Sequence, residues 1–179
     1  MLKVYLAGSW SRKEELAEHI VTFHKYGIPV VSRWLNEPVS GDTELADIPD
    51  DYLISAAITD LHDLAACDVL ILFSNGYGSE NVGGGRFFES GIAYQQNKPV
   101  ITVGDPEMIF QRMGEDELMY TCETLHDAIT LVLTWQNELD QAHSRMEARR
   151  DNIAFVQRLN DEGGQQYALD FGGTLWGGI

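Results

Sequence analysis

The chain has 179 residues, of which 44% are hydrophobic, so we expect one domain of ordinary size and exclude wholesale disorder. Its 12 Lys and Arg residues stand against 28 Asp and Glu residues, and the net charge of -16 argues against binding of polymeric nucleic acid. No apolar run is long enough to span a membrane, and the first residues lack a signal-peptide pattern. We therefore expect a cytoplasmic protein with no membrane partner.

Short apolar runs alternate with helical patterns along the chain. Apolar runs bounded by glycine, proline or acidic residues predict strands, and apolar residues at helical spacing predict helices. In chain order the sequence predicts a strand at 2–7, a helix ending at Gly27, a strand at 30–34, a surface loop at 35–49, a helix at 50–66, a strand at 69–73, a helix at 86–96, strands at 99–103 and 118–121, a helix at 123–140 with a polar helical segment to about 160, and a glycine-rich tail at 161–179.

This alternation is typical of an α/β protein with a parallel sheet. The pattern predicts a single domain over 1–179 with a flavodoxin- or Rossmann-like three-layer sandwich, a five-stranded and mainly parallel sheet, and extra C-terminal helices. Ligands of such sheets bind outside the carboxyl ends of the strands. We therefore expect the site in the segments 8–12, 33–36, 74–89 and 104–106.

The glycine-rich stretch before the helix at 86–96 is the strongest local feature. Three glycines at 83–85 let the backbone approach a ligand closely, and the following helix N-terminus offers free N–H groups. Glu89 is expected in the first turn of that helix, either as a site carboxylate or as an acid that stabilises the helix dipole. The stretch matches neither the Walker motif nor the Rossmann fingerprint.

Two acids and two aromatic residues are further candidates. Asp60 and Asp63 are three residues apart and share a helix face, where a solvated acidic face is the more ordinary interpretation. Tyr5 interrupts an apolar strand, and its hydroxyl needs either a polar core atom or a site carboxylate as partner. Trp10 is a candidate to stack on a planar ligand or a rim aromatic that only packs.

Three blocks follow one another along roughly residues 2–104. They are Val4-Tyr5-Leu6-Ala7-Gly8, then Asp60-Leu61 ahead of Asp68-Val69, then Gly84-Gly85-Arg86-Phe87-Phe88-Glu89-Ser90-Gly91-Ile92-Ala93 followed by Lys98-Pro99-Val100. In this order the blocks resemble the nucleoside 2-deoxyribosyltransferase family and the related nucleotide N-glycosidases, and Ser32-Arg33-Trp34-Leu35 is similar to a segment of shorter relatives.

The resemblance implies a catalytic role for three residues. Glu89 is then the nucleophile that attacks C1′ of a 2-deoxyribosyl group, Asp60 orients that carboxylate and handles the proton of the base, and Tyr5 hydrogen-bonds Glu89. A nearby carboxylate stabilises the oxocarbenium-like transition state and can trap it covalently. The implied reaction is cleavage of the N-glycosidic bond of a 2′-deoxynucleoside or its 5′-monophosphate, with transfer to another base or to water, and it needs no metal or cofactor.

The remaining candidates would bind the substrate. Arg12, Arg33 and Arg86 would form a positive spot, which suits a 5′-phosphate at least as well as a bare nucleoside, or they pair with the many acids. The other candidates at the same strand ends are Gly8, Ser9, Trp10, Asp63, Asn81, Gly84 and Gly85.

Two rival functions keep the same fold. In a non-catalytic nucleotide-binding module, Glu89 would bind a ribose hydroxyl. A flavodoxin-like FMN protein would need a Ser/Thr-rich phosphate loop after the first strand, and none is recognisable. We also expect a homo-oligomer, a dimer or larger, because the helical stretch 123–160 carries Leu125, Ile129, Leu133 and Leu139 on one side and relatives in the resembled family assemble in this way.

Overall fold

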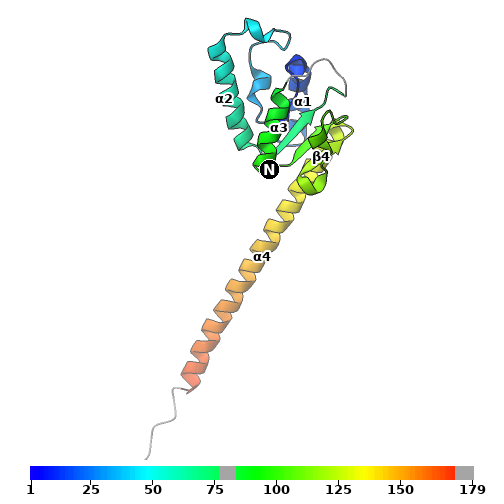
Figure 1. Cartoon of the computed structure of the whole chain (residues 1–179). Coiled ribbons are helices and arrows are strands. Elements are labelled where there is room, and N and C mark those ends of the chain that lie inside the picture. The colour runs from blue at the N-terminus through cyan, green and yellow to red at the C-terminus, as the bar shows by residue number, and fades with distance from the viewer. Residues whose placement is uncertain (77–83, 172–179) are drawn as a thin grey trace, which may run out of the picture. The chain divides into compact units, whose positions relative to one another are not determined.

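The structure is a computed structural model that describes residues 1–76 and 84–171 (Figure 1). The chain divides into two compact units, Met1–Gln136 and Asn137–Ile179. Its helices and strands are β1 (Val4–Ala7), α1 (Lys13–Lys25), α2 (Asp50–Ala66), β2 (Val69–Phe73), α3 (Gly85–Gln95), β3 (Val100–Val103), β4 (Met119–Cys122) and α4 (Leu125–Phe171), with short 3-10 turns at Trp10–Arg12, Arg33–Asn36, Leu45–Asp47, Ile109–Arg112 and Glu115–Glu117.

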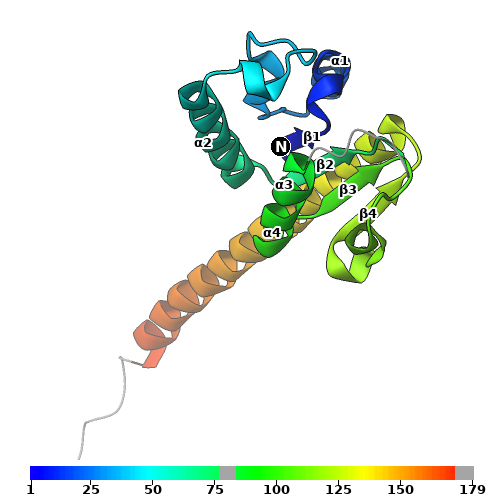
Figure 2. The ribbon, with the colours of Figure 1, turned by 45° about the horizontal axis from the view of Figure 1, so that its top comes forward.

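A parallel sheet of four strands forms the centre of the first unit, in the order β1-β2-β3-β4. Every residue of β1 and β2 is buried, because helices cover both faces of the sheet and leave these strands no solvated side. In Figure 2, α3 lies in front of the strands and the first turns of α4 lie behind them. The predicted α/β fold with a parallel sheet and three layers is therefore confirmed.

The predicted strand at 30–34 is wrong, and with it the five-stranded sheet. Val30 makes only an isolated parallel bridge to Val4, and the chain then turns into the 3-10 segment Arg33–Asn36. Where a further strand would pair with Leu6, side chains form the hydrogen bonds instead. The amide of Leu6 donates to Ser32 Oγ, and its carbonyl accepts from Trp34 Nε1. With both main-chain groups of Leu6 occupied, the ladder cannot extend beyond the bridge.

The end of β1 packs closely against α1. A Cβ atom added to Gly8 would lie 2.3 Å from Leu16 Cδ1, a distance that no real contact allows. Leu16 itself is fully buried beneath the strand. Glycine at this position therefore lets the chain leave β1 against the helix, which is where the candidate site lies.

The C-terminal region forms one helix, where the prediction was a helix at 123–140 that continues or breaks into a polar helical segment to about 160, followed by a glycine-rich tail. Helix α4 runs without a break from Leu125 to Phe171 and so includes residues 161–171 of the expected tail. The stretch 123–171 contains no proline, and the two glycines at 163–164 cost only about 1 kcal/mol each relative to alanine. The rest of the expected tail, 172–179, lies outside the described residues. Within the described residues, no helix is long and apolar enough to cross a membrane.

Candidate active site

A pocket of about 140 Å³ lies where the chain leaves β1. Segments from β1, the turn Arg33–Asn36, α2 and α3 meet there, as expected for the carboxyl ends of parallel strands. All of the lining residues except Trp34 are site candidates from the sequence. The pocket is lined by Gly8, Ser9, Trp10, Trp34, Asp60, Gly85, Arg86 and Glu89.

Glu89 projects from α3 toward the first strand. The Tyr5 hydroxyl donates to Glu89 Oε1 at 2.9 Å, so the hydrogen bond that the resemblance implied is confirmed. The first turn of α3 contains no acidic residue, and Glu89 lies one turn further along. Its interpretation as a first-turn acid that stabilises the helix dipole is therefore wrong.

Burial and crowding shift the pKa values of the two carboxyl groups in the pocket. Burial raises the pKa of Glu89 to about 7, the nearby Asp60 carboxylate adds to the rise, and the hydrogen bond from Tyr5 opposes it. Burial also raises the pKa of Asp60 to about 6, with further contributions from Asp63 and Glu37, while Arg33 lowers it. Between these values the pair holds about one proton, and the titration belongs to the pair as a whole.

Tyr5 is suited to act only as a donor. Its side chain is fully buried in β1, and burial, followed by the charges of Glu89 and Asp60, raises the pKa of its hydroxyl above the usual range. The phenol therefore stays protonated at neutral pH. Its hydroxyl donates its hydrogen bond to Oε1 of Glu89.

Asp60 and Asp63 share a face of α2 and have different partners. Asp63 is buried and accepts two hydrogen bonds from Arg33, at 2.9 Å from the amide and 2.7 Å from Nε. This pairing holds the turn Arg33–Asn36 against α2. Asp60 lines the pocket, and its buried Oδ1 has no hydrogen-bond partner among the described residues. The interpretation of these acids as a solvated face is therefore wrong.

Two tryptophans form an aromatic wall of the pocket. The rings of Trp10 and Trp34 stack with centroids 6.2 Å apart and an interplanar angle of 27°. Trp34 is fixed by its hydrogen bond to the Leu6 carbonyl at 2.9 Å. Trp34 was not predicted as a site residue, although it lies in the segment 33–36 at the predicted strand ends. Its place in the pocket depends on the 3-10 turn Arg33–Asn36, which the sequence did not predict.

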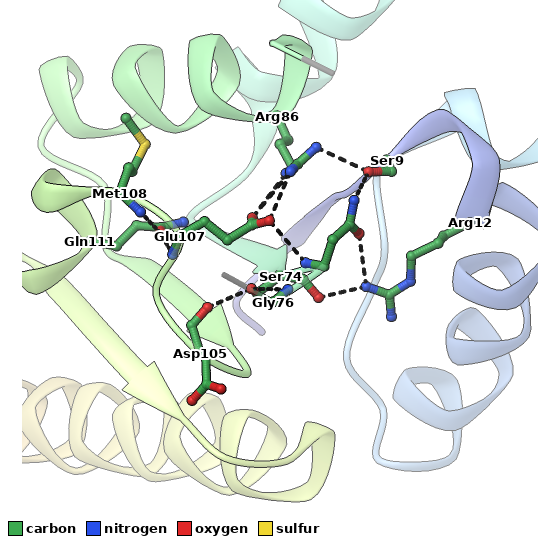
Figure 3. A network of polar contacts seen from close by, with 10 residues as sticks. Ser9, Arg12, Ser74, Gly76, Arg86, Asp105, Glu107, Met108 and Gln111 are labelled. Atoms are coloured by element: carbon green, nitrogen blue, oxygen red, sulfur yellow. Dashed lines mark hydrogen bonds and ion pairs between the residues drawn. The ribbon is translucent and has the colours of Figure 1, made fainter. Parts of the chain in front are cut away.

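Arg86 and Glu107 form a buried ion pair beside the pocket (Figure 3). Arg86 Nη2 donates to both carboxylate oxygens of Glu107, at 3.0 and 3.2 Å, and its Nη1 donates to Ser9 Oγ at 3.0 Å. Asn75 joins the network by donating to Ser9 Oγ and to Glu107 Oε1. The network ties the start of α3 to the ends of β1, β2 and β3. Glu107 was missed in the sequence, although it follows directly on the strand-end segment 104–106.

The other predicted basic residues are also paired with carboxylates. Arg12 bonds Glu15 at 2.6 and 2.8 Å and the Ser74 carbonyl at 2.7 Å, and Arg33 pairs with Asp63. None of Arg12, Arg33, Asp63 and Gly84 is among the described residues that line the pocket, and Asn81 lies outside the described residues.

Two glycines leave open space at the start of α3. Added Cβ atoms at Gly84 and Gly85 would meet no atom of another element within 4 Å in the described structure. Packing against the described residues therefore does not require glycine at these positions. No group of three or more His, Cys, Asp or Glu residues suited to a metal ion occurs within 1–76 and 84–171.

Comparison with solved structures finds the same fold in a known enzyme. A 2-deoxyribosyltransferase from Bacillus psychrosaccharolyticus is 20% identical, with a TM-score of 0.52 over 71% of this chain and 90% of that chain. A CMP N-glycosidase from Clostridium botulinum is 17% identical, with a TM-score of 0.43 over 67% of this chain and 85% of that one. No family model and no curated protein matches the sequence. The resemblance to nucleoside 2-deoxyribosyltransferases is thus confirmed at the level of the fold.

Proposed function

We propose that this protein cleaves the N-glycosidic bond of a 2′-deoxynucleoside or its 5′-monophosphate and transfers the deoxyribosyl group to another base or to water. The observation that carries the proposal is that Glu89 and Asp60 line one pocket, while the buried Tyr5 donates its hydroxyl to Glu89 from β1. Two carboxyl groups with pKa values raised by burial to about 7 and about 6 suit a reaction that needs a nucleophile and an acid near neutral pH. The shared fold with a 2-deoxyribosyltransferase supports the same assignment.

In the first step, the free carboxylate oxygen of Glu89 attacks C1′ of the deoxyribosyl group. A C–O bond forms, the C–N bond breaks, and its electron pair leaves with the base. The pKa values of about 7 for Glu89 and about 6 for Asp60 place the single proton of the pair more often on Glu89, and the reaction proceeds from the minor form in which Glu89 is ionised and Asp60 holds the proton. Asp60 gives this proton to a base nitrogen, because a protonated base departs more easily. The products are a glycosyl ester on Glu89, a free base and an ionised Asp60.

In the second step, the ionised Asp60 takes a proton from the acceptor. The acceptor nitrogen of a second base, or the oxygen of water, attacks C1′ and displaces Glu89 as carboxylate. Tyr5 holds Glu89 in place through both steps. The stacked indoles of Trp10 and Trp34 offer a flat apolar surface for a base.

Chromatography of reaction mixtures tests the reaction. The protein is incubated with a panel of ribo- and deoxyribonucleosides and their monophosphates, with and without a second free base. We expect free base from deoxyribosyl substrates, and none above background with Glu89→Gln. Mass spectrometry of the intact protein should show a deoxyribosyl adduct that this variant lacks. Glu18→Gln, an exposed acid on α1, is the matched control. Nucleotide binding without base release by the unmodified protein would contradict the proposal in favour of a binding module.

We also propose that the chain self-associates through the part of α4 between Leu139 and Val156. Leu139, Met146 and Ile153 are exposed and recur every seven residues, with Val156 three residues after the last. Seven-residue apolar spacing is the pattern by which helices of two chains pair. Light scattering should give a mass above that of one chain, and Met146→Glu should reduce it. A monomer mass for the unmodified protein would contradict this proposal.

A further inference from the structure

We propose that Glu107 determines substrate charge: by neutralising Arg86 it leaves the described lining of the pocket without a cationic side chain available to a phosphate, so the enzyme accepts an uncharged nucleoside and disfavours its 5′-monophosphate. This inference rests on the proposed function. The proposed function allows either a 2′-deoxynucleoside or its 5′-monophosphate as substrate, and this inference selects the nucleoside.

The Arg86–Glu107 pair is almost fully removed from water. The side chain of Arg86 is 1% exposed and that of Glu107 is 9% exposed, and the guanidinium donates to both carboxylate oxygens. A phosphate could use Arg86 only by displacing Glu107, which would leave a buried carboxylate without its partner. Leaving a buried carboxylate without its ion-pair partner is energetically unfavourable, because water does not solvate its charge. Arg86 therefore lines the pocket as half of a neutral pair.

The other two arginines at the strand ends are also paired with carboxylates, and neither is among the described residues that line the pocket. Arg12 is held by both carboxylate oxygens of Glu15 and by the Ser74 carbonyl, and its Nη1 contacts Asn75. These contacts occupy the donors with which Arg12 would otherwise bind a phosphate. Arg33 is bound to the buried Asp63 through Nε, and its side chain is 59% exposed to solvent outside the pocket.

The lysine beside Trp10 also has hydrogen-bond partners. Lys13 lies 5.4 Å from the centre of the Trp10 ring, is buried, and donates to the main-chain carbonyls of Glu37 and Val39. Its ammonium group therefore satisfies backbone oxygens behind the indole. The two segments outside the described residues, 77–83 and 172–179, contain no Lys or Arg in their sequence.

The charged side chains that remain in the described lining of the pocket are acidic. Glu89 and Asp60 both line it, and each already has its pKa raised by burial, a sign that negative charge is unfavourable there. A phosphate monoester would bring up to two further negative charges beside these carboxyl groups. Like charges placed together in an interface oppose binding, whereas the 5′-hydroxyl of a nucleoside adds no charge.

Paired kinetic measurements test the inference. For one deoxynucleoside and its 5′-monophosphate with the same base, we expect kcat/KM at low salt to favour the nucleoside by about tenfold or more. In Glu107→Gln, Arg86 loses its charge partner, so the preference should shift toward the monophosphate by about tenfold through a lower KM for that substrate. A residue that merely supported the fold would change both substrates alike.

Two further variants keep the test decisive. Glu15→Gln unpairs Arg12 at a partly exposed position where folding is not at risk, and should shift the preference in the same direction by a smaller factor. Glu18→Gln removes an exposed acid from the same helix and should leave the preference unchanged. A wild-type preference for the monophosphate would overturn the inference while the proposed function stands. So would an unchanged ratio in a folded Glu107→Gln protein, or in Glu15→Gln if the first variant does not fold.

If neither substrate releases base, the proposed function fails, and calorimetric binding of the same two ligands decides the inference. Tighter binding of the nucleoside than of its monophosphate supports it. Tighter binding of the monophosphate, or binding of neither ligand, overturns it.

Discussion

Replacing Glu89 by glutamine should remove activity and stabilise the protein at the same time. Burial raises the pKa of Glu89 from its ordinary 4.5 to about 7, so the folded protein holds this proton more tightly than the unfolded chain does. Below pH 4.5 both states are protonated and there is no cost. As the pH rises from 4.5 to about 7, the unfolded chain loses its proton first, and the folded state becomes less stable. The full cost of about 3 kcal/mol is present above pH 7.

Glutamine keeps the shape of the side chain and an acceptor for the Tyr5 hydroxyl, and it carries no charge. Urea denaturation of the unmodified protein and of Glu89→Gln, at about pH 4.5 and about pH 8, measures the effect. We expect nearly equal stabilities at the lower pH and a variant more stable by up to about 3 kcal/mol at the higher pH. The exposed control Glu18→Gln should change stability by less than about 0.5 kcal/mol at either pH. A difference between Glu89→Gln and the unmodified protein that does not depend on pH would refute the reasoning.

Three further predictions concern Tyr5, Asp60 and Asp63. Tyr5→Phe removes a hydrogen bond to Glu89, so the pH profile of base release should move to higher pH by about one to two units, because the pKa of Glu89 rises further. Asp60→Asn should slow release of a poorly leaving base by about a hundredfold or more, and should spare a deoxyribosyl substrate whose leaving group needs no proton. Asp63→Ala should destabilise the fold by about 1–3 kcal/mol in urea denaturation, since Arg33 loses two acceptors. The same variant should move the limb of the pH profile that reports Asp60 to lower pH, because the Asp63 carboxylate raises the pKa of Asp60.

The candidate site was partly predictable because its residues follow local patterns. Tyr5 within an apolar strand and Glu89 after a glycine-rich stretch are visible without any long-range information. Their hydrogen bond depends on α3 crossing β1, which joins residues 84 positions apart in the chain. The sequence suggested the contact only through a resemblance to known proteins, since no local rule determines which side chains meet at such a distance.

Pairing between charged residues could not be predicted in the same way. Each of Arg12, Arg33 and Arg86 had many acids available in a chain with 28 of them. Glu107 binds Arg86 because the loop after β3 returns beside the start of α3, and no spacing in the sequence signals that return. Whether these three arginines form a phosphate-binding site or pair with carboxylates is therefore decided by the tertiary structure.

The sequence by itself determined the alternation of buried strands with helices, because burial on both faces requires continuous apolar runs such as 69–73. It also determined that candidate side chains gather at the carboxyl ends of the strands. Only the tertiary structure decided that the chain at Val30 makes a bridge and no strand, because Ser32 and Trp34 occupy the main-chain groups of Leu6. It also decided which charges survive in the pocket, because ionic pairing depends on distances that folding alone sets.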